Sequence, residues 1–159
     1  MTDSRICIAL DFQNKAEVKE FLEKFNDEKL YVKVGMELFY GEGIEIIKMI
    51  KEMGHNIFLD LKLHDIPNTV KSAMKQLAKL DVDMVNVHAS GSIAMMKAAI
   101  DGLNEGANGG KRPLCIAVTC LTSLDQKVLD DELLIHEPLE KVVLKWAQNA
   151  KEAGLDGVV

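Results

Sequence analysis

Short runs of Val, Ile and Leu alternate along the chain with longer segments in which apolar residues recur every three or four positions. The short runs are typical of buried strands, and the longer segments are typical of amphipathic helices. Their regular alternation indicates parallel strands joined by right-handed helical crossovers. We predict strands at Ile6–Asp11, Tyr31–Gly35, Ile57–Leu61, Met84–His88, Leu114–Thr119 and Gly157–Val159.

Capping residues mark the ends of the predicted helices. Asn14 can cap a first helix that runs to residue 25, and Gly54 fits the end of a second helix, whose apolar face covers 44–53. The segment Asn104–Lys111, rich in glycine and asparagine, is predicted to be a loop. Three further helices are expected at Asn68–Lys79, at Ser92–Leu103 and from Pro138 to Gly154.

The two faces of the predicted strands differ in a way that favours a barrel. On the second strand Val32 and Val34 share one face, while Lys33 shares the other face with Tyr31 and Gly35. Small or polar residues on one face of successive strands fit an α/β protein of the (β/α)8 TIM-barrel class. A doubly wound sheet would carry apolar residues on both faces and often a glycine-rich nucleotide turn.

The chain is shorter than a complete barrel of this class. Eight βα units typically occupy about 250 residues. The 159 residues supply roughly the first five to six units, and the last predicted strand is still in progress at Val159. We therefore expect residues 1–159 to form a single incomplete barrel domain, truncated at its C-terminal end.

Composition narrows the possible partners and compartment. Apolar residues make up 48% of the chain, and the net charge is −6 with lysines and acids interspersed. Nucleic acid is therefore not expected as a partner, because binding to phosphate backbones needs a basic patch. No apolar stretch is long enough to cross a membrane, and residues 1–6 lack the features of a secretory signal. Three cysteines without metal-binding spacing fit a reducing environment, so we expect a cytoplasmic protein.

Four charged residues fall at the C-terminal ends of predicted strands on the inward face. They are Asp11, Lys33, Asp60 and Lys62, and Asp65 follows in the adjoining loop. Buried charges are costly unless paired, and an ion-pair cluster is often no more stable than apolar residues in its place. One interpretation is a salt-bridge cluster that only seals the mouth of the barrel. We favour a functional site, because barrels carry their catalytic groups at this face.

The same residues belong to motifs that resemble the orotidine 5′-phosphate decarboxylase family in its bacterial form. The likeness runs along the whole chain, and the stretch from Asp60 to Thr69 is its most specific part. The resemblance implies a cofactor-free lyase reaction of pyrimidine biosynthesis, in which orotidine 5′-monophosphate loses CO2 to give UMP. The motifs are Ile8-Ala9-Leu10-Asp11, Val32-Lys33-Val34-Gly35, Asp60-Leu61-Lys62-Leu63-His64-Asp65-Ile66-Pro67-Asn68-Thr69 and Thr119-Cys120-Leu121-Thr122-Ser123.

The resemblance also implies a role for each of these residues. Lys62 would protonate C6 of the pyrimidine, Asp11 and Lys33 would hold ribose hydroxyls, and Thr122 would lie in the base-binding loop. The implied catalytic residues are Lys62, Asp60, Asp65 and Lys33. The implied substrate contacts are Asp11, Lys33, Asp60, Leu61, Lys62, Leu63, His64, Asp65, Ile66, Pro67, Asn68, Thr69 and Thr122. A homodimer is implied as well, in which the partner's site is completed by Asp65, Ile66 and Thr69.

The implied chemistry suits the residue types. Loss of CO2 leaves a carbanion with no conjugated sink, so a fixed ammonium beside the developing charge is a natural stabiliser. The same ammonium can then protonate the carbon, and lysine does this more readily than arginine. No cofactor and no metal are expected.

Two departures from the family pattern limit these expectations. Cys120 stands where many members carry glutamine, which we interpret as a tolerated change, although a reactive thiol remains open. The family's phosphate-gripping lid and Gly-Arg turn would lie beyond Val159. We therefore expect the 159 residues alone to be inactive.

Two alternatives are weighed against this reading. One is a Mg²⁺-dependent sugar-phosphate decarboxylase or aldolase of the same superfamily, which shares the Asp-x-Lys-x-x-Asp motif. Those enzymes hold the metal partly with an acidic residue at the position of Lys33, and a cation there fits a hard-cation site poorly. The other alternative is an inactive half-barrel that serves as a binding module.

Overall fold

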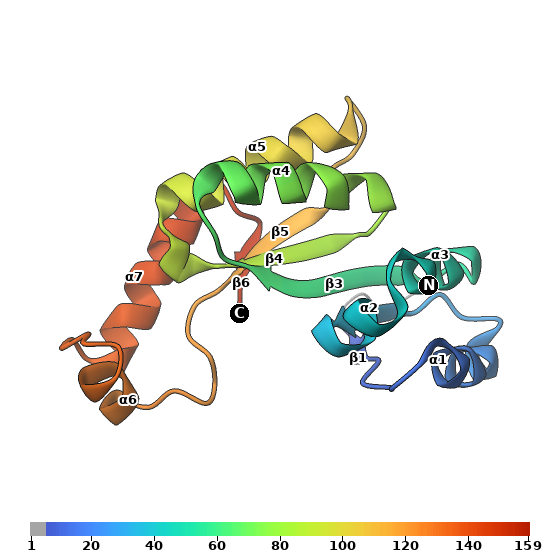
Figure 1. The fold of residues 1–159 in the computed structure, drawn as a ribbon, viewed down its shortest axis with the longest axis horizontal. Helices are drawn as coiled ribbons and strands as arrows, with labels where there is room; N and C mark the ends of the chain where they lie inside the picture. The colour runs from blue at the N-terminus through green and yellow to red at the C-terminus, as the bar shows by residue number, and fades with distance from the viewer. Residues whose placement is uncertain (1–5) are drawn as a thin grey trace.

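The computed structural model of the protein describes residues 6–159 and contains a sheet of parallel strands (Figure 1). Residues 1–5, which make up most of the segment expected not to be a secretory signal, lie outside the described part. The strands are β1 (Ile8–Ala9), β2 (Tyr31–Gly35), β3 (Asn56–Leu63), β4 (Met84–His88), β5 (Leu114–Val118) and β6 (Gly157–Val158).

The order of the strands in the sheet decides between the two architectures. Each strand pairs in parallel with the next one along the chain, so the order is β1-β2-β3-β4-β5-β6. A doubly wound sheet would reverse direction partway, which this sheet does not do. The expected α/β class is therefore confirmed, and the sheet is part of a (β/α) barrel.

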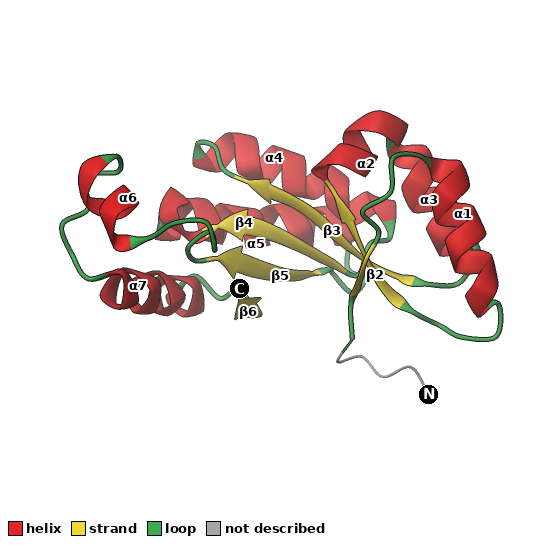
Figure 2. Cartoon of the chain, turned by 90° about the horizontal axis from the view of Figure 1, so that it is seen from below, coloured by secondary structure: helices red, strands yellow, loops and turns green. Residues whose placement is uncertain are grey.

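Helices separate the strands (Figure 2). Three short 3₁₀ turns follow α1, α4 and β4. Asn14 caps α1 as expected, because its Oδ1 accepts the Glu17 N–H at 3.0 Å. None of the described helices is long and apolar enough to cross a membrane. The helices are α1 (Lys15–Leu22), α2 (Met36–Glu42), α3 (Ile44–Glu52), α4 (Pro67–Leu77), α5 (Ile93–Ala107), α6 (Gln126–Asp131) and α7 (Leu139–Glu152), and the 3₁₀ turns are η1 (Glu23–Phe25), η2 (Ala78–Leu80) and η3 (Ala89–Gly91).

The hydrophobic core lies between one face of the sheet and the helices. Val32 and Val34 are fully buried there, as their parity predicted, and Lys33 between them stays partly exposed on the opposite face. Burial of a side chain of this size contributes about 1.5–3 kcal/mol. The apolar face therefore holds the sheet to its helices and leaves the other face for polar groups.

Four strands differ from their predicted bounds, of which β5 and β6 only end one residue early, at Val118 and Val158. β1 covers only Ile8–Ala9 instead of Ile6–Asp11, because it pairs with β2 only at Val32 and Lys33 and is an edge of the described sheet. β3 continues past Leu61 to Leu63, and its pairing with β4 shifts register on the way.

The predicted loop Asn104–Lys111 is wrong over its first half, where α5 continues to Ala107. Gly106, one of the glycines that suggested a loop, serves helix packing instead, together with Gly102 one turn earlier in α5. A Cβ on Gly102 would meet the backbone carbonyl of Lys71, and one on Gly106 would meet that of Lys75. Glycine therefore lets α5 lie directly against α4, and the two helices run side by side in Figure 1.

Two helices were not expected from the sequence. α2 begins at Met36, immediately after β2, and α6 begins after Asp125, whose side chain accepts the Val128 N–H at 2.9 Å. Neither helix carries a long apolar stripe, since each buries a single residue, Leu38 or Leu129. The periodic signal that marks a helix was therefore too short to detect.

Candidate functional site

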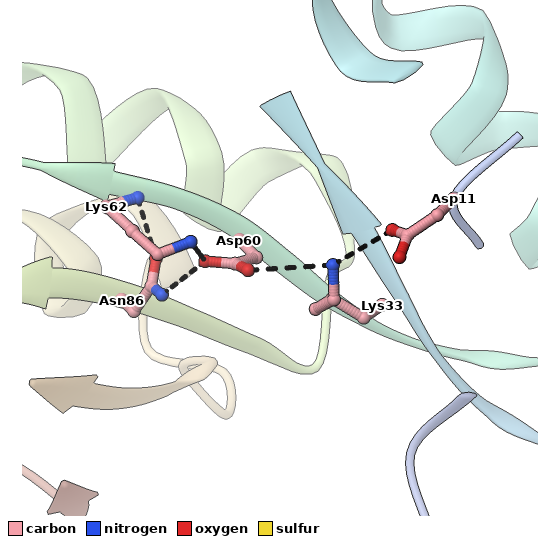
Figure 3. A network of polar contacts seen from close by, with 5 residues as sticks. All are labelled: Asp11, Lys33, Asp60, Lys62 and Asn86. Carbon is pink, nitrogen blue, oxygen red and sulfur yellow. Dashed lines mark hydrogen bonds and ion pairs between the residues drawn. The ribbon is translucent and has the colours of Figure 1, made fainter. Parts of the chain in front are cut away.

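A chain of ion pairs crosses the C-terminal ends of β1, β2 and β3 (Figure 3). The Lys33 Nζ lies 3.4 Å from Asp11 Oδ1 and 3.7 Å from Asp60 Oδ2. The Lys62 Nζ lies 2.6 Å from the other Asp60 oxygen, Oδ1. The four charged residues predicted at the mouth of the barrel are thus brought together, in alternating order of sign.

Asp60 is the centre of this network and its most buried member. Only 7% of the residue is exposed, and Oδ1 accepts a second hydrogen bond, from Asn86 Nδ2 at 2.6 Å. Burial acts to raise the pKa of Asp60. The hydrogen bonds from Lys62 and Asn86 and the charges of Lys62 and Lys33 outweigh it, so the pKa lies below the ordinary value. The carboxylate is therefore held ionised between two ammonium groups.

Lys62 reaches Asp60 from an irregular backbone, which simple strand alternation does not describe. Its φ angle is +52°, in the left-handed region that residues with a Cβ seldom adopt. Its N–H donates to Asn86 Oδ1 at 2.8 Å, within the stretch where β3 and β4 lose their common register. The side chains of Asp60 and Lys62 still meet, but at a bulge and not on a regular strand face.

Asn86 is the member of the network that sequence reasoning missed. It is 2% exposed and lies on β4, two positions before His88 and therefore on the same face. A polar residue between Val85 and Val87, on the face that already carries His88, was the signal available in the sequence. That signal is weak, because a single buried asparagine is also common as a structural residue.

The segment from Asp65 to Thr69 stands apart from the network. These residues are exposed on the loop after β3 and on the first turn of α4. Asp65 Oδ1 accepts the N–H of Ile66 at 2.6 Å, and no ion pair joins Asp65 to Lys33 or Lys62 within the described chain. The charge network within this chain therefore consists of Asp11, Lys33, Asp60 and Lys62. Asp65 is not part of it, and its carboxylate binds the backbone of its own loop.

The remaining predicted contacts divide between the core and the surface. Leu61 is buried, Leu63 is half-buried, and Pro67, Asn68 and Thr122 are exposed. None of these five residues takes part in the charge network (Figure 3).

A cavity of about 500 Å3 lies at the same end of the sheet, between the ends of β3, β4 and β5 and α7. His64 and His88 face each other across one wall, with ring centroids 5.5 Å apart, and Trp146 and Cys120 form part of the lining. Burial, followed by the positive potentials of His64 and Lys62, lowers the pKa of His88. Burial raises the pKa of Cys120, which keeps its thiol protonated and argues against a reactive thiolate.

Comparison with known proteins identifies the family. A model described as "Orotidine 5′-phosphate decarboxylase / HUMPS family" matches residues 4–159. The chain belongs to this family. The expectation drawn from the motifs at Asp60–Thr69 is thereby confirmed.

Individual relatives of this decarboxylase family agree. Orotidine 5′-phosphate decarboxylase of Bacillus mycoides (strain KBAB4) is 62% identical over 155 residues, which are 97% of this chain and 65% of the relative. A structure of an uncharacterized conserved protein from Geobacillus kaustophilus superposes with a TM-score of 0.94 at 57% identity, over 96% of this chain and 71% of that one. Orotidine 5′-phosphate decarboxylase from Lactobacillus acidophilus gives a TM-score of 0.89 at 45% identity, over 96% and 69%. The chain thus spans slightly less than two thirds of the curated relatives it matches.

Proposed function

We propose that this protein catalyses the cofactor-independent decarboxylation of orotidine 5′-monophosphate to UMP and CO2. The observation that carries the proposal is the chain of ion pairs, in which the Lys62 ammonium is held 2.6 Å from a buried carboxylate at the C-terminal ends of the strands. Active sites of barrel enzymes lie at this end. Curated relatives 62% identical to this chain carry the name of that enzyme.

The reaction follows from the placement of Lys62. The bond between C6 of the pyrimidine and the carboxylate carbon breaks, CO2 leaves, and the electron pair stays on C6. The Lys62 ammonium stabilises this charge and then gives its proton to C6, which leaves a neutral amine that water reprotonates. A lysine already fixed by Asp60 and Asn86 needs little reorganisation when the charge develops.

The other members of the network orient the substrate. Asp60 holds the Lys62 ammonium and lies where the substrate carboxylate would depart, so that the two carboxylates repel each other in the ground state. Lys33 and Asp11 offer a donor and an acceptor at the far end of the network, which suits the ribose hydroxyls. Thr122 is assigned to the loop that holds the base.

We further propose that the protein is a cytoplasmic homodimer. Asp65, Ile66 and Thr69 are exposed and make no contact with the charge network of their own chain, so they are free to complete the site of a partner. Ile66 is 67% exposed, an apolar side chain that a partner surface would shield. His64, Pro67 and Asn68 belong to the same exposed stretch and would line the substrate together with Leu61 and Leu63.

The Mg²⁺-dependent alternative fits the residues less well. The carboxylates that a hard cation would use, Asp11 and Asp60, both lie within 4 Å of the Lys33 ammonium. Within residues 6–159 no three His, Cys, Asp or Glu side chains form a metal-binding group. The observation that favours the decarboxylase is therefore the lysine placed between these two carboxylates.

Because the 159 residues alone are expected to be inactive, the proposal is tested with purified protein that has the full length of the relatives, and with two lysine variants of that same protein. Consumption of orotidine 5′-monophosphate is followed by its loss of ultraviolet absorbance, for the wild type, for Lys62→Ala and for Lys48→Ala. Lys48 is a matched control, because it is an exposed lysine on α3 paired with Glu45. We expect Lys62→Ala to lose about 10³-fold or more in rate and Lys48→Ala to match the wild type. A wild type without turnover, or an unimpaired Lys62→Ala, would overturn the proposal.

A further inference from the structure

The bulge in β3 leaves one backbone group without a regular partner. Leu59 of β3 pairs with Val85 of β4, and Leu63 pairs with Val87. Three residues of β3 therefore lie opposite the single residue Asn86, and Lys62 is one of the three. An unpaired buried N–H costs about 1–3 kcal/mol. The side chain of Asn86 removes this cost by accepting the Lys62 N–H at 2.8 Å in place of a ladder carbonyl.

The other end of the same amide binds the carboxylate of the network. Asn86 Nδ2 donates to Asp60 Oδ1 at 2.6 Å, the same oxygen that the Lys62 Nζ approaches to 2.6 Å. The amide cannot turn over, because its oxygen would then face Asp60 and its NH2 would face the N–H of Lys62. Asn86 is 2% exposed, so water does not compete for either bond.

We propose that Asn86 is the positioning residue for Lys62. The amide of Asn86 fixes both the backbone and the side chain of Lys62. It accepts the N–H and so holds the backbone in the left-handed conformation, and it binds Asp60, which holds the ammonium. Asparagine suits this task because it offers one acceptor and a donor on a single short side chain. Aspartate in its place would repel Asp60, and alanine would leave the Lys62 N–H unpaired and remove one of the two donors to Asp60 Oδ1. The kinetic consequence rests on the proposed decarboxylation.

The test compares Asn86→Ala, Asn86→Asp and a control, Val85→Ala. Val85 is fully buried on the same strand but faces the helices, so its truncation weakens packing without touching the network. For Asn86→Ala we expect kcat to fall about 10²-fold with KM nearly unchanged, because a misplaced lysine affects the transition state more than binding. Asn86→Asp keeps an acceptor for the Lys62 N–H but loses the donor to Asp60. Its acidic limb in the pH profile of kcat should therefore move to higher pH.

A second readout does not depend on turnover. Titration of the ¹³C-labelled Asp60 carboxyl by NMR should give a higher pKa in both Asn86 variants than in the wild type and in Val85→Ala. If the wild type has no activity, the proposed function fails while this titration still tests the contact. A kcat loss in Asn86→Ala no greater than in Val85→Ala, or an unchanged Asp60 titration, would overturn the role of Asn86.

Discussion

The two ends of the sheet use carboxylates in different ways. At the N-terminal end, Asp83 accepts the Ile57 backbone N–H at 2.8 Å and pairs with Lys51 at 3.0 Å. Asp156 accepts a backbone N–H of β5 at 2.7 Å and pairs with Arg112. Each of these acids precedes one strand and binds the backbone of its neighbour. They therefore tie strands together at a fixed register.

Asp60, at the C-terminal end, is bonded by side chains. Its partners are Lys62, Asn86 and Lys33, and its network includes a lysine with left-handed backbone. The acids at the N-terminal end thus bind backbone groups, while Asp60 holds the side chains to which the proposed function assigns the chemistry. Under the proposed function, similar ion pairs serve stability at one end of the sheet and chemistry at the other, and substitutions at the two ends should separate these effects.

The largest effect is expected for Asp60→Asn. The change keeps the shape of the side chain but removes the charge that fixes Lys62 and Lys33. We expect kcat/KM to fall by about 10³-fold, while the free energy of unfolding changes by no more than about 2 kcal/mol, because both lysines are partly exposed to water. Steady-state rates and urea unfolding measure the two quantities. Loss of folding in proportion to the loss of rate would place Asp60 with the acids of the other end.

The reverse pattern is expected for Asp83→Asn. The Ile57 N–H can still be accepted by the amide oxygen, but the pair with Lys51 is lost. We expect the free energy of unfolding to fall by about 1–2 kcal/mol. The rate with orotidine 5′-monophosphate should stay within about twofold of the wild type, since Asp83 lies at the opposite end of the strands. A large fall in kcat for a folded Asp83→Asn would contradict the division between the ends.

The smallest effect is the pH dependence of stability. The pKa values of Asp60 and Asp156 are both lowered from 3.8, because donors outweigh burial in each case. A carboxyl with a lowered pKa in the folded protein stabilises it above the ordinary pKa and loses this contribution as pH falls through the folded value. The free energy of unfolding in urea should therefore fall between pH 7 and pH 3 in the wild type. In Asp156→Asn the same fall should be about 1 kcal/mol smaller. An equal fall in the two proteins would mean that the ion pair of Asp156 does not stabilise the fold.

The sequence predicts the bounds of two strands correctly, and each of them has a neighbouring strand on both edges. β2 and β4 have the bounds that their valine runs predict, Tyr31–Gly35 and Met84–His88. β1 is shorter than predicted because pairing, which hydrophobicity does not report, limits an edge strand. The glycines in Asn104–Lys111 misled the prediction, since Gly106 marks close helix packing and not a turn.

The site was predictable in its charges and not in its backbone. Parity alone brought Asp11, Lys33 and Asp60 to one end of the sheet, and the structure places them together. The bulge that turns Lys62 to positive φ depends on the register between β3 and β4, which a single strand does not encode. Asn86 was missed for the same reason, because its importance arises only from what lies opposite.

The positive φ of Lys62 has a consequence for how this position would evolve. Glycine adopts that conformation freely, whereas a residue with a Cβ pays about 1–2 kcal/mol for it. In a library of variants selected for folding alone, glycine should therefore become frequent at position 62. In a library selected for growth that depends on the proposed decarboxylation, lysine should be retained there. The difference in the frequencies of glycine and lysine at position 62 would measure how much folding stability is lost in order to keep the ammonium group there.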